Sequence, residues 1–486
     1  MTSLPCNTVN VDTPPIVVTE PRNVIRAFMV LGFFALISLG SFAVDHRFIY
    51  YSAYLWFGFT YGMSLQYGRF CMASAIRDLF AVGVPRMAVG IMIAVVLFSL
   101  VAAFVTVAGK STFHPSPIGL YSVIGGLIFG IGMIYTGGCA SGSLYKTGEG
   151  SVAALLVVLS LAFAQVLVVD AGGWFNHLVP MAWTQSTIAK NLPAVITPTN
   201  GWYDQFLAGY IWNLSAHTVG ELLGFTNAVY AAFIGNSLIN SIIPAALILT
   251  GIYIRWYRKA YLRDNKTEYL GFRTELAGFW SMITASKRTA IAGLVLGVAA
   301  GLHMWVMQGL QQRLGISNAG ELLSGMGFSG LSIQDTIFDP GYFYITTQEA
   351  QGAAWVVQKL GFNVMDNIFF GLDNGVPNPL LNPVLWMSIA LVGGSAVMAL
   401  LNNEFKFKMP SPEIATWAIF GGILMGIGAR VGLGCNIGAF FATVTNGDPS
   451  GWLFCLGMTV GGFIGVKFFN WWIGRKMAKE MAVFDL

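Results

Sequence analysis

Apolar residues dominate this chain in long runs that are separated by shorter polar segments. Seven of these runs each approach the roughly 20 residues that a helix needs to cross the hydrocarbon core of a bilayer. They predict membrane-spanning helices at residues 27–44, 87–108, 152–169, 227–254, 289–310, 384–401 and 451–473. The pattern therefore predicts an all-α polytopic membrane protein.

Composition and charge agree with this prediction. The 486 residues are 55% apolar and 10% charged, against about 25% charged residues in ordinary soluble domains. Glycine supplies 58 residues, which suits close helix packing in a membrane. The net charge of +4 is spread over loops, so it bears on orientation and not on nucleic-acid binding. Residues 1–26 lack the layout of a cleaved signal peptide, and we expect the first helix to be retained.

Three further segments are dense in glycine, and each leads directly into a cysteine. They are residues 52–67, 118–135 and 414–433. We interpret them as candidates for broken or re-entrant helices around a central constriction. Irregular backbone at membrane depth is tolerated only where protein or a water-lined cavity satisfies its polar groups.

The glycines and cysteines of these segments form an internal repeat. The pattern is Gly, three residues, Gly, eight residues, Cys, and a fourth window has valine in place of the cysteine. The four copies are Gly58/Gly62/Cys71, Gly126/Gly130/Cys139, Gly422/Gly426/Cys435 and Gly293/Gly297/Val306. A duplicated membrane chain with a thiol at each break has the layout expected of a transporter's central site.

The distribution of basic residues predicts the orientation in the membrane. Eight Lys or Arg residues lie in the loop 255–288, but only one in 170–226 and two in 311–383. By the positive-inside rule the loop 255–288 is cytoplasmic and the two long insertions are outside. The tails 1–26 and 474–486 also carry basic residues and are expected inside.

This orientation predicts an inverted repeat. The helix after Cys139 (152–169) then ends outside, whereas its counterpart after Cys435 (451–473) ends at the cytoplasmic tail. Equivalent elements that end on opposite sides indicate two inverted halves, 27–169 and 289–473, joined by 227–288. The broken segments of the two halves would meet near the membrane midplane.

The residues around the cysteines suit a small anion that carries soft sulfur. Small neighbours leave backbone N–H groups free to face a cavity, and a half-helix N-terminus there offers partial positive charge. A buried neutral thiol is a weak, polarizable donor that is compatible with a sulfur or selenium atom. The candidate path residues are Cys71, Cys139, Cys435, Arg69, Gly138, Gly434 and Asn436.

Structural interpretations of the same residues compete with the functional ones. A single cysteine in a membrane helix is usually a small packing residue, and Gly-x3-Gly alone is a common packing motif. For Cys455 and His303 we expect a role in packing. Cys6 lies in the N-terminal tail, and Arg77 and Asp78 are expected to form a local ion pair at the surface. For four charged residues two interpretations compete, namely that they line the path or that their side chains extend (snorkel) to the membrane interface. These are Arg69, Lys146, Glu149 and Arg430. The chain has no C-x2-C, H-x3-H or HExxH spacing, so we expect no metal and no cofactor.

Three segments resemble the YeeE/YedE family of bacterial inner-membrane sulfur transporters. They are GRFCMASAIRDLF (68–80), GGCASGSLYKTGEG (137–150) and GARVGLGCNIGAFFATVTNGDPSGW (428–452). The resemblance implies thiosulfate uptake through an hourglass-shaped, duplicated all-helical protein. It also implies that a cysteine of each motif lines the path, here Cys71, Cys139 and Cys435. The insertions 170–226 and 311–383 depart from compact members, and a selenium-linked branch leaves the substrate open.

We therefore expect a permease for thiosulfate or a related sulfur anion in the bacterial inner membrane, with cytoplasmic termini and a cytoplasmic sulfurtransferase as a candidate partner. The alternatives are a transporter of a selenium compound and a membrane sulfurtransferase that forms a cysteine persulfide. Against the enzyme, no His or Lys lies near any motif cysteine except Lys146, and a nucleophilic thiolate normally needs a nearby base or cation. A third alternative is an assembly partner that docks through tryptophans of the first insertion. These are Trp174, Trp183, Trp202 and Trp212. The oligomeric state is left open.

Overall fold

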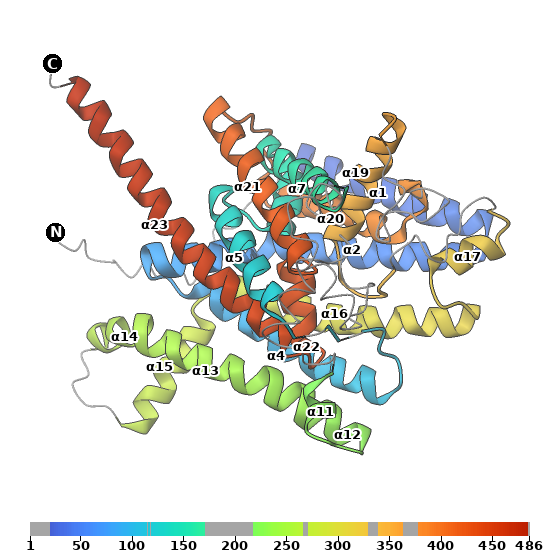
Figure 1. Ribbon diagram of the computed structural model, residues 1–486, viewed down its shortest axis with the longest axis horizontal. Helices are drawn as coiled ribbons and strands as arrows, with labels where there is room; N and C mark the ends of the chain where they lie inside the picture. The colour runs from blue at the N-terminus through green and yellow to red at the C-terminus, as the bar shows by residue number, and fades with distance from the viewer. Residues whose placement is uncertain are drawn as a thin grey trace, which may run out of the picture.

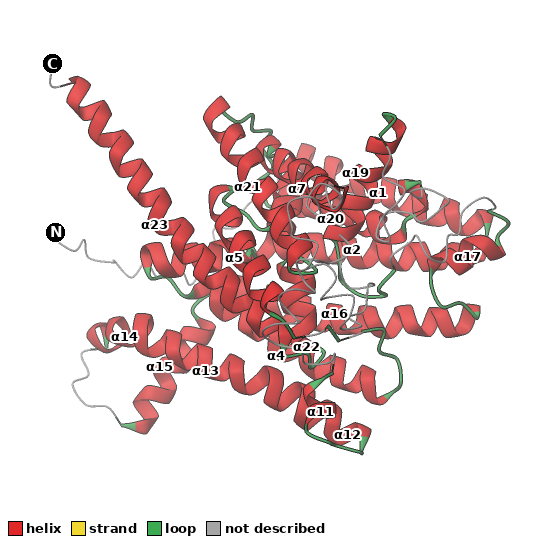
Figure 2. Ribbon diagram, in the orientation of Figure 1, coloured by secondary structure: helices red, strands yellow, loops and turns green. Residues whose placement is uncertain are grey.

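The computed structural model describes residues 20–113, 115–116, 118–170, 217–265, 271–328, 339–362 and 378–484. Within these ranges the regular structure is helical, and one isolated bridge joins Ser151 to Lys408 (Figure 2). Eight described helices are long and apolar enough to cross a membrane. The prediction of an all-α polytopic membrane protein is confirmed. The tryptophans of the first insertion and Cys6 lie outside the described residues.

Each apolar run that was predicted to span the membrane is a helix. Six runs correspond to α1 (Pro21–Val44), α4 (Arg86–Val107), α7 (Val152–Asp170), α16 (Lys287–Leu314), α20 (Pro383–Leu401) and α23 (Ser450–Phe484). The seventh is a continuous series of α12 (Ala228–Tyr230), η4 (Ala231–Ile242), α13 (Ile243–Ile252) and η5 (Tyr253–Tyr257). The shorter connecting helices are η1 (His46–Phe48), η2 (Asp78–Val82), α11 (Val219–Leu222), α14 (Arg258–Asp264), α15 (Phe272–Thr284), α17 (Ala319–Gly325), α19 (Thr346–Lys359) and η6 (Pro379–Leu381).

The glycine-dense segments are themselves unbroken helices, and the break follows each of them. They form α2 (Ile49–Gly68), α5 (Leu120–Tyr135) and α21 (Pro412–Val431). A short helix starts directly after each cysteine: α3 (Met72–Arg77), α6 (Ala140–Gly148) and η7 (Asn436–Ala442), which continues into α22 (Thr443–Thr445). The predicted short helices are confirmed, but each break lies between a glycine-dense segment and its cysteine.

The paired glycines bring helices of the two halves into backbone contact. A methyl group on Gly58 or Gly62 of α2 would overlap the carbonyl oxygens of Met387 and Leu391 on α20. The other three pairs meet carbonyl oxygens four residues apart in the same way, on α23, α4 and α7. Small residues allow such close approach, so the packing interpretation of Gly-x3-Gly holds for all four windows.

The pairings between helices cross from one half of the sequence to the other. α5 packs along α23 and α21, and α21 packs along α7. Likewise α2 packs along α20 and α16, and α16 packs along α4. Exchanging the first half with the second converts α5–α23 into α21–α7 and α2–α20 into α16–α4, and it maps α5–α21 and α2–α16 onto themselves.

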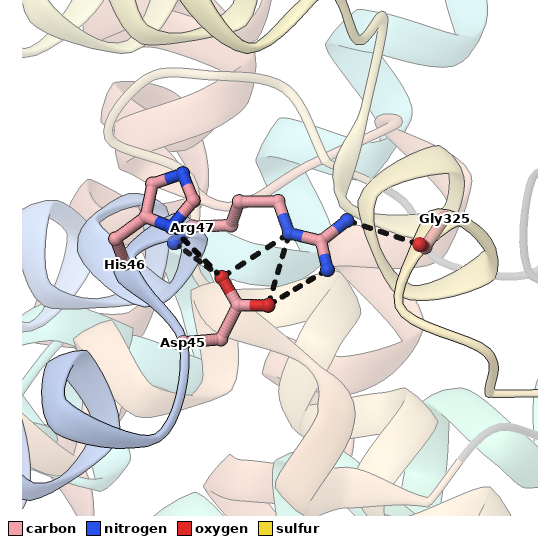
Figure 3. A network of polar contacts seen from close by, with 4 residues as sticks. All are labelled: Asp45, His46, Arg47 and Gly325. Carbon is pink, nitrogen blue, oxygen red and sulfur yellow. Dashed lines mark hydrogen bonds and ion pairs between the residues drawn. The ribbon is translucent and has the colours of Figure 1, made fainter.

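The helices that carry the basic loop and the C-terminus lie at one end of the molecule. Figure 1 shows α14 and α15 on the same side as the end of α23, with α11, α12 and α17 opposite. At that opposite end, the turn between α1 and α2 is tied to α17 (Figure 3). The carboxylate of Asp45 accepts from Nη2 of Arg47 at 2.7 Å, and Nη1 of Arg47 donates to the carbonyl of Gly325 at 3.0 Å.

Candidate functional site

The three breaks share one backbone geometry. The residue two positions before each cysteine is left-handed, with φ of 49° at Arg69, 64° at Gly137 and 58° at Leu433. Each cysteine is then extended and stands at the N-cap of the following short helix. A left-handed non-glycine residue costs on the order of 1 kcal/mol, which the surrounding structure must offset at Arg69 and Leu433. The repeat therefore places each thiol at a helix N-terminus.

The first two cysteines lie in direct contact. Sγ of Cys71 is 3.6 Å from Sγ of Cys139, and both residues are buried. Oγ of Ser141 lies 3.5 Å from Sγ of Cys139. A methyl group on Gly142 would lie 2.6 Å from Sγ of Cys71 and 3.3 Å from Sγ of Cys139. The two thiols thus fill a space that the missing side chain of Gly142 leaves open.

Cys435 is also buried, and it lies beneath an aromatic side chain from the second insertion. The backbone N–H of Ile437 donates to Sγ of Cys435 at 3.4 Å. The ring of Tyr344 packs directly against Gly438, and its hydroxyl donates to the carbonyl of Leu433 at 2.7 Å. A methyl group on Gly434 would lie 2.8 Å from the same hydroxyl oxygen.

Neighbours of all three cysteines line one small central cavity of about 20 Å³. Phe70 and Met72 come from the first motif, Ser141 from the second, and Asn436 and Ile437 from the third. Oδ1 of Asn436 is buried and makes no hydrogen bond within the described part of the chain. The volume suffices for roughly one water molecule, so the centre is closed to a larger ion.

Two larger cavities lie near opposite ends of α16. The guanidinium of Arg288, at the start of this helix, packs over the ring of Tyr67, two residues before Arg69. Arg69 lines a cavity of about 320 Å³, which we call the cationic cavity. Near the end of the helix, Gln311 lines a cavity of about 780 Å³, which we call the large cavity. At 1.5 Å per residue, the helix carries the chain about 35 Å from one to the other.

The two cavities differ in charge. The described lining of the cationic cavity carries more basic than acidic side chains, namely Arg69, Arg77, Arg86, Lys146 and Lys408 against Asp78, Glu149 and Glu404. Nη2 of Arg69 donates to Glu404 at 2.8 Å, and Nζ of Lys146 donates to the carbonyl of Gly137 at 2.5 Å. Hydroxyls and amides line much of the large cavity, and the one ionisable carboxylate among its described lining residues is Asp339.

The structure separates the competing interpretations of the charged residues. Arg69, Lys146 and Glu149 line the cationic cavity. Arg430 is only 1% exposed, with Nη2 at 3.4 Å from Oγ1 of Thr347. The snorkelling alternative is therefore wrong for Arg430. Arg77 and Asp78 form the expected local pair at 2.9 Å.

The remaining sequence candidates pack away from the central cavity. His303 is buried, stacks on Phe57 with ring centroids 4.5 Å apart, and shares a hydrogen bond with the Tyr61 hydroxyl. Val306 lies within the unbroken helix α16, and Cys455 lines a separate apolar cavity. Within the described ranges, no three His, Cys, Asp or Glu side chains gather as a metal site. Three cavity-lining residues of the second insertion were not predicted from the sequence, namely Phe343, Tyr344 and Thr347.

The sequence is similar to those of known proteins. A family model described as sulphur transport matches residues 67–464, which include all three motif cysteines. The chain belongs to this sulphur transport family. The thiosulfate transporter TsuA of Spirochaeta thermophila is 26% identical over 409 residues, covering 82% of this chain and 92% of the relative.

Two Escherichia coli relatives extend the comparison. The thiosulfate transporter TsuA of strain K12 is 22% identical over 406 residues, which cover 83% of this chain and 90% of the relative. The probable transporter YedE of the same strain is 30% identical over 130 residues, which cover 26% of this chain and 32% of that protein. The family and these relatives confirm the YeeE/YedE resemblance and the prediction of a transporter.

Proposed function

We propose that this protein is a permease that carries thiosulfate, or a closely related sulfur-containing anion, across the bacterial inner membrane. One observation carries the proposal. Three buried thiols, each at the N-cap of a short helix, have neighbours that line a single central cavity between two larger cavities. The names of the relatives over most of the chain support thiosulfate as the substrate.

In this proposal the anion moves from the large cavity past Cys435 and the central cavity to the pair Cys71 and Cys139. Each S–H group donates weakly to the soft terminal sulfur, and the short-helix N-termini offset the negative charge. Gly138 and Gly434 leave room beside the backbone. Within the constriction, Oδ1 of Asn436 is a buried acceptor that makes no hydrogen bond to the described residues. Passage requires local opening, because the central cavity holds roughly one water.

Arg69 and the other cations of the cationic cavity receive the anion at the far end. Opposite charges attract across this solvent-accessible space, so the cavity favours release from the thiols toward that side. A cytoplasmic sulfurtransferase that collects the product there is the partner we propose. Its docking would bring an acceptor thiol close to Arg69 and Lys146.

We infer that the two halves are inverted and that the cationic cavity faces the cytoplasm. The crossed helix pairings support a two-fold relation between the halves, since α5–α23 corresponds to α21–α7 and α2–α20 to α16–α4. The basic helices α14 and α15 share one end with the C-terminus of α23, which supports a cytoplasmic location (Figure 1). Single cysteines introduced at Asn265 and Ser317 should react with an impermeant reagent from opposite sides. Reaction of both from one side would contradict this topology.

Uptake of radiolabelled thiosulfate into proteoliposomes tests the function. Alanine at Cys71, Cys139 or Cys435 should lower the initial rate several-fold, because a lost hydrogen bond in a dry constriction costs about 1 kcal/mol or more. Cys455→Ala, outside the central cavity, should transport at the rate of the unmodified chain. Uptake that is unaffected by all three alanine variants would refute the thiol path.

The same vesicles separate the rival functions. A selenium analogue that competes much better than unlabelled thiosulfate would favour the selenium-linked alternative. Doubly labelled thiosulfate that arrives intact supports transport. Release of sulfite with sulfur retained on a cysteine would instead indicate a sulfurtransferase, since that enzyme must break the S–S bond and form a persulfide.

A further inference from the structure

Two adjacent aromatic residues form part of the wall between the large cavity and the central cavity. Tyr344 lines the large cavity, and Phe343 lines the central cavity. Both side chains are buried, at 7% and 1% exposure. At this point the partition is therefore a single stretch of chain, and it comes from the second insertion.

Each aromatic ring packs against a complementary surface. The ring of Phe343 stacks on Tyr61 of α2, with centroids 3.9 Å apart and planes inclined by 22°. The ring of Tyr344 lies on Gly438, where any side chain would overlap it. Its hydroxyl bonds to the carbonyl of Leu433, two residues before Cys435. On the side of the large cavity, the partition thus packs against the residues on both sides of Cys435.

One end of the partition is held by a carboxylate. Oδ2 of Asp339 accepts from the Tyr50 hydroxyl at 2.6 Å and from the backbone N–H of Ala319 at 2.9 Å. Oδ1 accepts from the Tyr54 hydroxyl and from the backbone N–H of Gly341 at 3.3 Å. The Tyr54 hydroxyl also accepts from the N–H of Gly341, at 2.8 Å. Four donors on one carboxylate fix this end against α2 and α17.

We propose that residues 339–345 form a gate on the large-cavity side of the path, with Phe343 and Tyr344 as its closing residues and Asp339 as a positioning residue. This inference rests on the proposed function in one respect, that the path passes Cys435. To open, the ring of Tyr344 leaves Gly438 and gives up its bond to Leu433. The gate then uncovers Cys435 while the contact of Cys71 with Cys139 stays in place.

The accessibility of Cys435 tests the gate without any transport assay. The full-length chain with all its cysteines is placed in proteoliposomes and exposed, from the large-cavity side, to a membrane-impermeant methanethiosulfonate. Peptide mass mapping then reports the modification of each cysteine with time. Because no thiosulfate is needed, a failure of the proposed function leaves this measurement unaffected.

Cys435 should react slowly in the unmodified chain and at least about tenfold faster in Tyr344→Ala, which removes both the ring and its hydrogen bond. Tyr344→Phe keeps the ring and loses the bond of the hydroxyl to Leu433, so an increase of about fivefold is expected. Gln308→Ala changes the lining of the same cavity outside the partition and should leave the rate unchanged. Equal rates in the unmodified chain and Tyr344→Ala would overturn the proposal.

Asp339→Asn tests the positioning role. The amide keeps the size of the side chain but weakens the bonds from Tyr50 and Tyr54, since charge-assisted bonds are roughly twice as strong as neutral ones. Cys435 should be labelled several-fold faster in this variant, and Asp339→Glu should restore part of the protection. Combined with Tyr344→Ala, the substitution should add little further. A lower melting temperature with unchanged labelling of Cys435 would mean that Asp339 only stabilises the fold.

Discussion

Substitution of Gly142 by alanine places one methyl group between the two contacting thiols. The new Cβ would lie 2.6 Å from Sγ of Cys71 and 3.3 Å from Sγ of Cys139. Ordinary packing keeps such atoms roughly 3.5–4 Å apart, so the thiol of Cys71 must move by about 1 Å. The helix itself tolerates the change, because alanine is the better helix former by about 1 kcal/mol. The strain therefore falls on the thiol pair.

Overpacking of a tight site costs about 1–3 kcal/mol. If this energy raises the barrier for the anion at the pair, the initial rate of thiosulfate uptake falls by about fivefold to 150-fold. The assay is uptake into proteoliposomes at matched protein content, beside the melting temperature of the same preparation. Gly32→Ala is the matched control, since no described atom lies within 4 Å of a methyl group there.

A second variant distinguishes obstruction from loss of a thiol. Cys71→Ala removes the sulfur that the new methyl group meets, so adding it to Gly142→Ala should restore the melting temperature. It should not restore uptake, because a donor has been lost. Wild-type uptake by Gly142→Ala, with an unchanged melting temperature, would refute the contact between the thiols or their place on the path.

Two further substitutions test the packing and the turn between α1 and α2. Gly126→Ala forces a methyl group onto the carbonyl of Phe454 and should lower the melting temperature in detergent, by the equivalent of about 1–3 kcal/mol, whereas Gly251→Ala should leave it unchanged. The hydrogen bonds from Arg47 lower the pKa of Asp45 from 3.8 to about 2 (Figure 3), so this pair stabilises the fold above about pH 4 and its contribution is lost as the pH falls toward 2. Asp45→Asn should remove that part of the pH dependence of the melting temperature, and an unchanged pH profile would contradict it.

The positions of the three cysteines could be predicted because their signal is local and repeated. Long apolar runs fix the spanning helices, and the recurrence of glycines and cysteine identifies equivalent points in them. Segments that carry the same sequence motif in different parts of a chain are expected to share a role. The structure indeed brings Cys71 and Cys139 into contact, and it brings the neighbours of Cys435 to the same central cavity.

The partition over Cys435 could not be predicted in the same way. Tyr344 lies 89 residues before Leu433, whose carbonyl it binds, and it belongs to no repeat. The Tyr344 side chain packs where Gly434 and Gly438 have no side chains. This packing partner can be recognised only once the insertion is folded against the two glycines. For Arg430 the sequence left snorkelling open as an alternative, for a related reason. Snorkelling assumes that a helix end lies at the interface, but α21 ends at a break beside the central cavity.

The fourth window shows which part of the repeat encodes a break. Gly293 and Gly297 pack against backbone carbonyls of α4 as the other pairs pack against their partners, yet α16 continues unbroken through Val306. Each of the three true breaks has a glycine within three residues before its cysteine, whereas residues 303–305 are His, Met and Trp. Glycine there favours the end of the helix, because it lowers helix stability by about 1 kcal/mol relative to alanine. The glycine pair therefore specifies a close helix crossing, and the later glycine favours the end of the helix. A cysteine has neighbours that line the central cavity only where both occur.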